Sequence, residues 1–228
     1  MTDTSAADGQ DPRRSNIDRR RTRARSSPSQ AYLNRRKELI DAAARVMSRK
    51  GVREATLGDI AQEAGTDRAS IYYYVRGKEE LLAEMLRSAL TADTESFRAI
   101  VAGPGPASVK LRAMVHRWMA SYDAHFPYLY VWVYEDPSRL QGIDSAVLEE
   151  MVDLSQQGYE LVREVIAEGV RSGEFRSTLP VGVLAQSALG LVAWTYRWYE
   201  PNHGLTAPEI ADGLADLLLS GLGAPGAS

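Results

Sequence analysis

The chain has 228 residues, which is enough for one large domain or two small ones and for a sizeable core. Hydrophobic residues make up 44% and charged residues 25%, as in an average globular protein, so wholesale disorder is excluded. Cysteine is absent, which excludes disulfide scaffolds, thiolate metal sites and cysteine nucleophiles and fits a cytoplasmic location. Residues 1–90 carry 18 Lys and Arg against 13 Asp and Glu, whereas residues 91–228 carry 9 against 17. The basic front suggests a polyanionic partner.

The first 30 residues are rich in Ser, Asp, Pro and Arg and contain one large aliphatic residue beyond the initiator, Ile17. Such a segment cannot bury enough apolar surface to offset its ordering entropy, so we expect a disordered arm over residues 1–30. Without an apolar run it does not resemble a signal peptide. The arm is either a solvated tail or a segment laid along phosphates or into a minor groove. Its position in the basic front of the chain favours the second, but nothing in the sequence fixes its geometry. Its arginines are Arg13, Arg14, Arg19, Arg20, Arg21, Arg23 and Arg25.

A helical pattern begins at Tyr32 and continues almost to the C-terminus. Gly51 should end the first helix, and Thr56, with Asp59 three residues later, should begin a short second helix that ends near Ala64. Gly65 supplies a turn before a third short helix over residues 67–73. Further helices are expected over residues 78–101, 108–125, 127–134, 147–171, 180–199 and 208–219.

Two segments offer alternatives to this all-α fold. The aromatic run 128–134 is β-prone, but a single short strand would have no partner. The uncharged stretch 177–196 is long enough to span a membrane, but Pro180, Gly182, Gln186 and other polar residues favour a largely buried helix. We therefore expect no membrane partner.

The helix pair around Gly65 has the arrangement that proteins use to read DNA. Ile60, Ala61 and Ala64 give the first of the two helices an apolar face for packing. The second presents small and polar side chains, whereas Ile71 and Val75 point inward. A long cation beside small residues, as at Arg68, favours a base or phosphate contact over a solvated charge.

The stretch TLGDIAQEAGTDRASIYYYVRGKEELL (residues 56–82) resembles the DNA-binding signature of the TetR family. Its elements are Thr, three residues, Ile-Ala, two residues, Ala-Gly, then a recognition helix, aromatic residues, a short turn and Lys before a Leu-rich helix. The match is close over residues 33–82, and the remainder agrees in length and helical layout. The resemblance implies a helix-turn-helix DNA-binding domain over 31–78 and a helical effector-binding and dimerisation domain over 79–228.

This resemblance also implies roles for individual residues. Thr56 and Lys78 should contact phosphates. Tyr72 and Tyr73 should meet the DNA backbone or a thymine methyl. The positions at the major groove or at its entry should be Thr66, Asp67, Arg68, Ala69 and Ser70. Two positions depart from the family pattern: Tyr74-Val75 replaces a common His-Phe pair, and Ala69 replaces a common Gly. They bear on the base contacts and not on the fold. Tyr74 is expected to pack in the protein. The variant DRASIYYYV, with WTYRWY at residues 194–199, is similar to a branch that includes repressors of lipid and sterol breakdown.

The second half is rich in aromatic residues, including all four tryptophans. Each ring alone is best explained as core, but the family resemblance implies a cavity for a hydrophobic or acyl-CoA-like effector among them. Arg163 and Arg197 could bind an anionic group, or could simply pair with Glu160, Glu164 or Glu200. The expected ligand-binding residues are Trp118, Tyr122, Phe126, Tyr130, Trp132, Tyr159, Arg163, Trp194, Arg197 and Trp198. No cofactor is expected, because His116, His125 and His203 lack metal-ligand spacing.

The last two helices carry stripes of small and apolar residues that could form a four-helix interface between two subunits. A dimer is also what reading the two half-sites of a palindromic operator requires. These stripes are Leu184, Ala188, Leu191 and Thr195, and Ile210, Leu214, Leu217 and Leu218. We therefore expect a homodimeric transcriptional regulator, most simply a repressor that a small molecule releases from DNA. An enzyme is the first alternative, but no nucleophile, base and orienting group can be assembled. A membrane-surface protein is the second.

Overall fold

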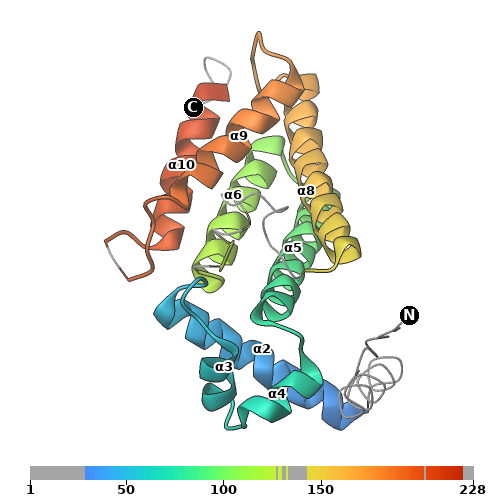
Figure 1. Ribbon diagram of the computed structural model, residues 1–228. Coiled ribbons are helices and arrows are strands. Elements are labelled where there is room, and N and C mark those ends of the chain that lie inside the picture. Colours follow the sequence, from blue (N-terminus) through green and yellow to red (C-terminus); the bar gives the residue numbers. More distant parts are fainter. Residues whose placement is uncertain (1–28, 127, 130–131, 133–142, 203, 223–228) are drawn as a thin grey trace, which may run out of the picture.

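The structure, a computed structural model, describes residues 29–126, 128, 129, 132, 143–202 and 204–222. The described part of the chain is helical and contains no strand, which confirms the all-α fold. Figure 1 shows a small group of helices at one end of the molecule and a taller bundle above it. The helices are α2 (Gln30–Lys50), α3 (Leu57–Glu63), α4 (Arg68–Tyr74), α5 (Lys78–Ala102), α6 (Ala107–Ala124), α8 (Ser145–Ser172), α9 (Val181–Thr195) and α10 (Ala207–Leu222).

The small group, which we call the head, consists of α2, α3 and α4. The Ser29 hydroxyl caps α2 by accepting from the Tyr32 amide at 3.2 Å, so the helix begins just inside the segment expected to be an arm. Gly51 ends α2 with a φ of +82°, a left-handed conformation that glycine adopts without strain. Gly65 makes the turn between α3 and α4 with a φ of +62°. The remainder of the arm, with its arginines, lies outside the described residues.

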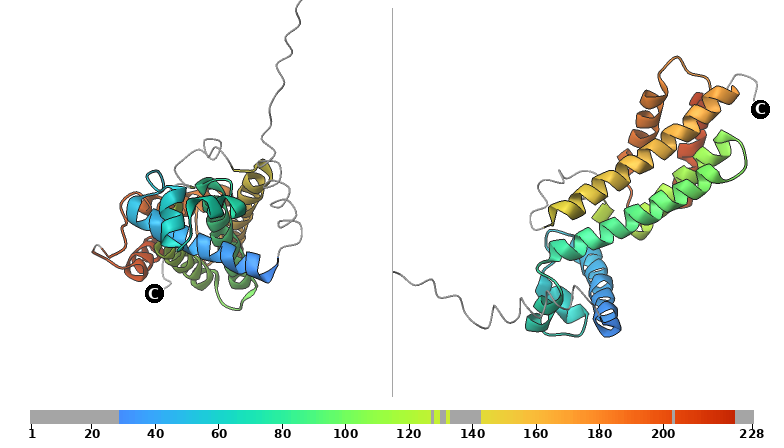
Figure 2. Two further views of the ribbon diagram at one scale, coloured as in Figure 1. Left: turned by 60° about the horizontal axis from the view of Figure 1, so that its bottom comes forward. Right: turned by 90° about the vertical axis from the view of Figure 1, so that its right-hand side faces the viewer.

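The taller bundle, which we call the core domain, is built from α5, α6, α8, α9 and α10. Helix α5 starts next to the head, where it contacts α2, and runs along α8, as the right-hand view of Figure 2 shows. Helix α10 packs along α6, and α9 packs on α8. Buried side chains form two clusters. One continues from the head into the lower core domain, and the other fills the far end around Phe97 and Phe175.

The structure changes part of one expectation about the last two helices. Of the expected dimer stripes, four residues are buried within the protein itself and cannot contact a second chain, namely Leu184, Ala188, Thr195 and Ile210. Leu191, Leu214 and Leu218 are half-buried, and Leu217 is exposed as a dimer residue should be. The cause is that helical periodicity shows which residues share a face but not which face turns inward. The outward residues of the same helices include Val183, Trp194 and Leu217.

The uncharged stretch 177–196 forms α9, which has only 15 residues. Within the described residues, no helix combines the length and apolar character needed to cross a bilayer. Of the expected helix over residues 127–134, Tyr128, Leu129 and Trp132 are helical, and the other positions lie outside the described residues.

Candidate nucleic-acid interface and ligand cavity

A capping box fixes the start of α3. The Thr56 hydroxyl accepts from the Asp59 amide at 3.2 Å, and the Asp59 carboxylate accepts from the Thr56 amide at 3.1 Å. Asp59 also accepts from the Lys50 ammonium at 2.6 Å. The hydrogen bond from Lys50, followed by those from Thr56, lowers the pKa of Asp59 to about 2. The first helix of the pair is thus anchored to the end of α2.

Helix α4 is capped by Asp67, whose carboxylate accepts from the amides of Ala69 and Ser70, each at 2.8 Å. The Ser70 hydroxyl donates to the same carboxylate at 2.5 Å and lowers its pKa. Because Ile71 is fully buried, the opposite side of this short helix faces outward. Arg68, Ala69, Ser70 and Tyr72 are exposed there, and Tyr72 shows 40% of its surface.

Aromatic rings attach α4 to α2. Tyr73 and Tyr74 meet edge to face, with ring centroids 5.0 Å apart, and Tyr32 of α2 lies 5.2 Å from Tyr74 and 6.0 Å from Tyr73. Such aromatic pairs add stability beyond the area they bury. The side of α4 opposite its exposed residues is therefore held by packing, as expected for Tyr74.

Two cations connect the head to α5. Arg36 of α2 donates to the Tyr74 carbonyl at 2.7 Å and forms ion pairs with Glu80 and Glu84 of α5 at 3.0 and 2.7 Å. The Lys78 ammonium donates to the carbonyls of Val52, Arg53 and Ala55 at 2.9, 2.6 and 2.8 Å. These contacts fix the helix pair relative to the first turns of α5.

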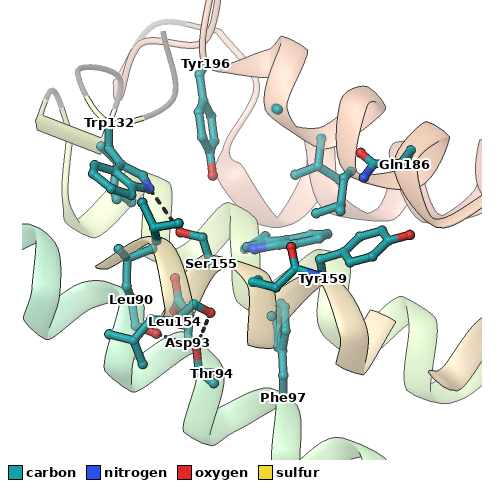
Figure 3. Close-up of a pocket in the computed structure, with 18 residues that line it drawn as sticks. Leu90, Asp93, Thr94, Phe97, Trp132, Leu154, Ser155, Tyr159, Gln186 and Tyr196 are labelled. Atoms are coloured by element: carbon teal, nitrogen blue, oxygen red, sulfur yellow. Dashed lines mark hydrogen bonds between the residues drawn. The ribbon is translucent and has the colours of Figure 1, made fainter. Parts of the chain in front are cut away.

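The core domain contains a cavity of about 460 Å³, within the range of small-molecule sites. Figure 3 shows residues of α5, including Phe97, on one side, and Gln186 and Tyr196 from the end of the chain that carries α9 on the other. Trp118 of α6, Trp132, and Ser155 and Tyr159 of α8 complete much of the wall. Most of this lining is apolar or aromatic.

Asp93 of α5 is the one Asp, Glu, Lys or Arg side chain in the described lining of the cavity. It is 8% exposed, and Arg117 of α6 contacts its Oδ1 atom through Nε at 2.8 Å and Nη2 at 2.7 Å. Burial raises the pKa of Asp93, and the hydrogen bond from Ser121 and the charge of Arg117 oppose this rise. The cavity therefore presents a negative group on an otherwise neutral surface.

Comparisons with known proteins match both halves of the chain. Residues 39–85 match the family model of bacterial regulatory proteins, tetR family, and residues 104–222 match the tetracyclin repressor-like C-terminal domain. The HTH-type transcriptional repressor KstR2 of Rhodococcus jostii is 32% identical over 192 residues, which cover 84% of this chain and 92% of that protein. The chain belongs to the TetR family.

Solved structures show the same TetR fold. The ketosteroid transcriptional regulator KstR2 of Mycobacterium tuberculosis has a TM-score of 0.72 at 26% identity, covering 83% of this chain and 95% of that one. FadR from Bacillus subtilis, solved in complex with stearoyl-CoA, has a TM-score of 0.64 at 20% identity, covering 82% and 98%.

Most residues that the TetR resemblance assigned to DNA are exposed in the head. Thr56, Asp67 and the α4 residues Arg68 to Ser70 and Tyr72 are exposed, and Thr66 is half-buried. Tyr73 is also half-buried, and its ring packs against Tyr32 and Tyr74. Lys78 departs from the expected role, because all three donors of its ammonium group are already bonded within the protein. A phosphate would have to displace one of these carbonyls, so the structure gives Lys78 a structural role instead.

The structure brings only some of the expected ligand-binding residues to the cavity of this TetR protein. Trp118, Trp132 and Tyr159 line it. Tyr122 is fully buried and stacks on the lining residue Tyr196 with centroids 3.9 Å apart, and Phe126 packs edge to face on Tyr122. Tyr130 lies outside the described residues.

Four expected ligand residues lie elsewhere. Trp194 and Trp198 are 61% and 54% exposed on the outer face of α9 and the turn after it, and the Arg197 guanidinium stacks over the Trp194 ring. Arg163 is exposed and pairs with Glu160 at 2.6 Å, which was the alternative to a ligand contact. None of these four residues lines the cavity.

The sequence did not point to the α5 side of the cavity, which consists of Leu90, Asp93, Thr94 and Phe97. One signal was present, since Asp93 falls at helical spacing between Ala89 and Phe97 on the inward face of α5. An acid in that position marks a buried charge with a partner. Within the described residues, no group of three or more His, Cys, Asp or Glu side chains could hold a metal ion.

Proposed function

We propose that this TetR protein represses transcription by binding a palindromic operator as a homodimer, and that a small molecule in the core-domain cavity releases it. The observation that carries the proposal is the outward surface of α4. A capped helix presents Arg68, Ala69 and Tyr72 to the outside, and a helix-turn-helix places such residues against base edges in the major groove. A DNA partner also implies that the protein works in the cytoplasm.

The effector class that we propose is hydrophobic and acyl-CoA-like. Phe97, Trp118, Leu189 and Val192 offer the cavity an apolar wall suited to an acyl or alicyclic group. Two proteins of the same fold support this choice. The structure of FadR from Bacillus subtilis holds stearoyl-CoA, and the structure of AibR holds isovaleryl coenzyme A together with operator DNA. The lining residues Val152, Gln156 and Gln186 are exposed, so the mouth of the cavity lies between α8 and α9. The charged nucleotide of a CoA ester would remain outside this mouth.

The homodimer is proposed to form through the outer face of α9 and α10. Val183 and Trp194 on α9 and Leu217 on α10 are large apolar residues left exposed in the single chain. Gly190 lies between Val183 and Trp194 on the same helical face and permits close approach of a second helix. Exposed apolar surface of this kind is typical of protein interfaces.

Helix α5 is the proposed connection between the two sites. Lys78 in its first turn holds the head, and Asp93, 15 residues later in the same helix, borders the cavity, about 22 Å away along the axis. An effector that fits the cavity better when α5 is shifted would favour a head position that no longer matches the operator. The ligand acts through this difference in affinity between two states.

The test uses the full chain and DNA from the region upstream of its own gene. Fluorescence anisotropy should show binding of that DNA, and stearoyl-CoA should reverse it in a saturable manner. Free coenzyme A is the control and should leave the complex intact. Failure to bind any fragment of the upstream DNA, or release by free coenzyme A alone, would contradict the proposal.

A further inference from the structure

The cavity has a closed side and an open side. Its floor is formed by α5, where Asp93, Thr94 and Phe97 are all buried. Its mouth lies on the opposite side, where Val152, Gln156 and Gln186 are exposed. A long ligand that enters through the mouth therefore brings the end of its tail to the floor. The groups on the floor decide which tail ends are accepted.

The polar groups near the floor differ in what they can still bind. The Thr94 hydroxyl donates to the Leu90 carbonyl at 2.8 Å, and the Ser155 hydroxyl donates to the Met151 carbonyl at 3.0 Å and accepts from Trp132. Both hydroxyl protons are therefore used inside the protein.

Asp93 keeps free acceptor capacity. Both close contacts of Arg117 go to its Oδ1 atom, and Ser121 supplies one further hydrogen bond. An ionised carboxylate offers about four lone-pair sites and has no proton to donate. Because Arg117 is not part of the cavity wall, a ligand meets the carboxylate of this pair rather than the cation.

We propose, on the basis of the effector site described above, that Asp93 makes the cavity select tails ending in a neutral hydrogen-bond donor and reject tails ending in a carboxylate. A hydroxyl at the tail end donates a charge-assisted hydrogen bond to Asp93. A methyl group makes no such bond. A second carboxylate meets the negative charge of Asp93 away from bulk water, where repulsion between like charges is strong.

Three esters of one chain length test this selection without coenzyme A: methyl decanoate, methyl 10-hydroxydecanoate and monomethyl decanedioate. Binding to the full chain at pH 8 is followed by tryptophan fluorescence, because Trp118 and Trp132 line the cavity. The hydroxy ester should bind at least about tenfold more tightly than methyl decanoate. Its advantage over monomethyl decanedioate, which ends in a carboxylate, should be larger still. Equal binding of the hydroxy ester and the carboxylate, or no binding of any ester, would overturn the proposal.

The matched variants are Asp93→Asn and Glu95→Gln. Asparagine keeps the size of the side chain but removes the charge and leaves Arg117 unpaired, so the preference for hydroxyl over carboxylate should fall at least about tenfold. Glu95 lies on the same helix, is exposed and does not line the cavity, so its variant should keep the wild-type order. An unchanged preference in a folded Asp93→Asn protein would also overturn the proposal. If the Asp93→Asn variant does not fold, the relative affinities of the three esters for the wild-type chain still test the proposal.

Failure of this proposal can be told from failure of the proposed function. The ester series is measured without DNA, whereas effector action is measured by release of the operator. The expected ester order without any release by acyl-CoA would refute the proposed effector and leave the role of Asp93 intact. Release by stearoyl-CoA together with equal binding of the hydroxy ester and the carboxylate would refute the role of Asp93 alone.

Discussion

Two nitrogens of Arg36 contact the same carboxylate oxygen of Glu84, Nε at 3.0 Å and Nη2 at 2.7 Å. The pair joins α2 of the head to α5 of the core domain. The remaining guanidinium nitrogen, Nη1, donates to the Tyr74 carbonyl at the end of α4. One side chain thus fixes the recognition helix to the helix that forms the cavity floor.

We predict that Arg36→Gln lowers the free energy of unfolding by about 2 kcal/mol, because it removes the ion pairs of Arg36 with two half-buried carboxylates and its hydrogen bond to a helix-terminal carbonyl. DNA affinity should fall as well, since the end of α4 is released. Urea unfolding and DNA anisotropy measure the two effects. Arg49→Gln is the control, because its ion pair with Glu63 is more exposed to solvent and its loss should lower the free energy of unfolding much less. Equal losses in both variants would contradict the special position of Arg36.

The structural role of Lys78 predicts a different result from a phosphate contact. Lys78→Met removes three hydrogen bonds to loop carbonyls, so the free energy of unfolding should fall by about 2 kcal/mol. The dependence of DNA binding on salt should keep its slope, because no counterion-releasing contact is lost. The result that would contradict this role is unchanged stability with a slope lower by about 1.

The low pKa of Asp59 predicts how acid affects the head. Its pKa in the folded protein is about 2, below the ordinary value of 3.8, so the carboxylate stabilises the folded state. This contribution is fully present above pH 3.8 and is lost as the pH falls toward 2. The difference in unfolding free energy between wild type and Asp59→Asn should therefore be constant above about pH 5 and shrink toward pH 2. A difference independent of pH over this range would show that the capping box contributes without its charge.

The sequence predicted the helices well because local chemistry specifies their ends. Thr56 with Asp59 begins α3, Asp67 begins α4, and Gly51 and Gly65 permit the turns between helices. These signals need no knowledge of distant contacts. The exposed residues of α4 were also predicted, because the apolar residue Ile71 shows which side of the helix is buried and therefore which side faces outward.

The cavity was harder to predict because it depends on how helices meet. Trp118 and Trp194 are equally aromatic in the sequence, yet one lines the cavity and the other is exposed on the outer face of α9. Only the packing of α9 on α8 decides between them. Lys78 shows the same limit, since its partners lie 23 to 26 residues earlier in a loop.

The proposed dimer face makes a prediction about assembly. Leu217→Glu places a charge on an exposed apolar position of α10, so it should yield monomers in analytical ultracentrifugation and preserve the helical content. Leu33→Glu, on an exposed position of α2 in the head, should remain dimeric. A dimeric Leu217→Glu protein would place the interface elsewhere.

The central claim is that the exposed surface of α4 reads DNA, and the double variant Arg68→Ala, Tyr72→Ala tests it most directly. Both side chains are exposed on α4, so circular dichroism and the oligomeric state should not change. Loss of two base or backbone contacts should weaken binding to the upstream DNA by roughly a hundredfold. Wild-type affinity in the folded double variant would contradict the account.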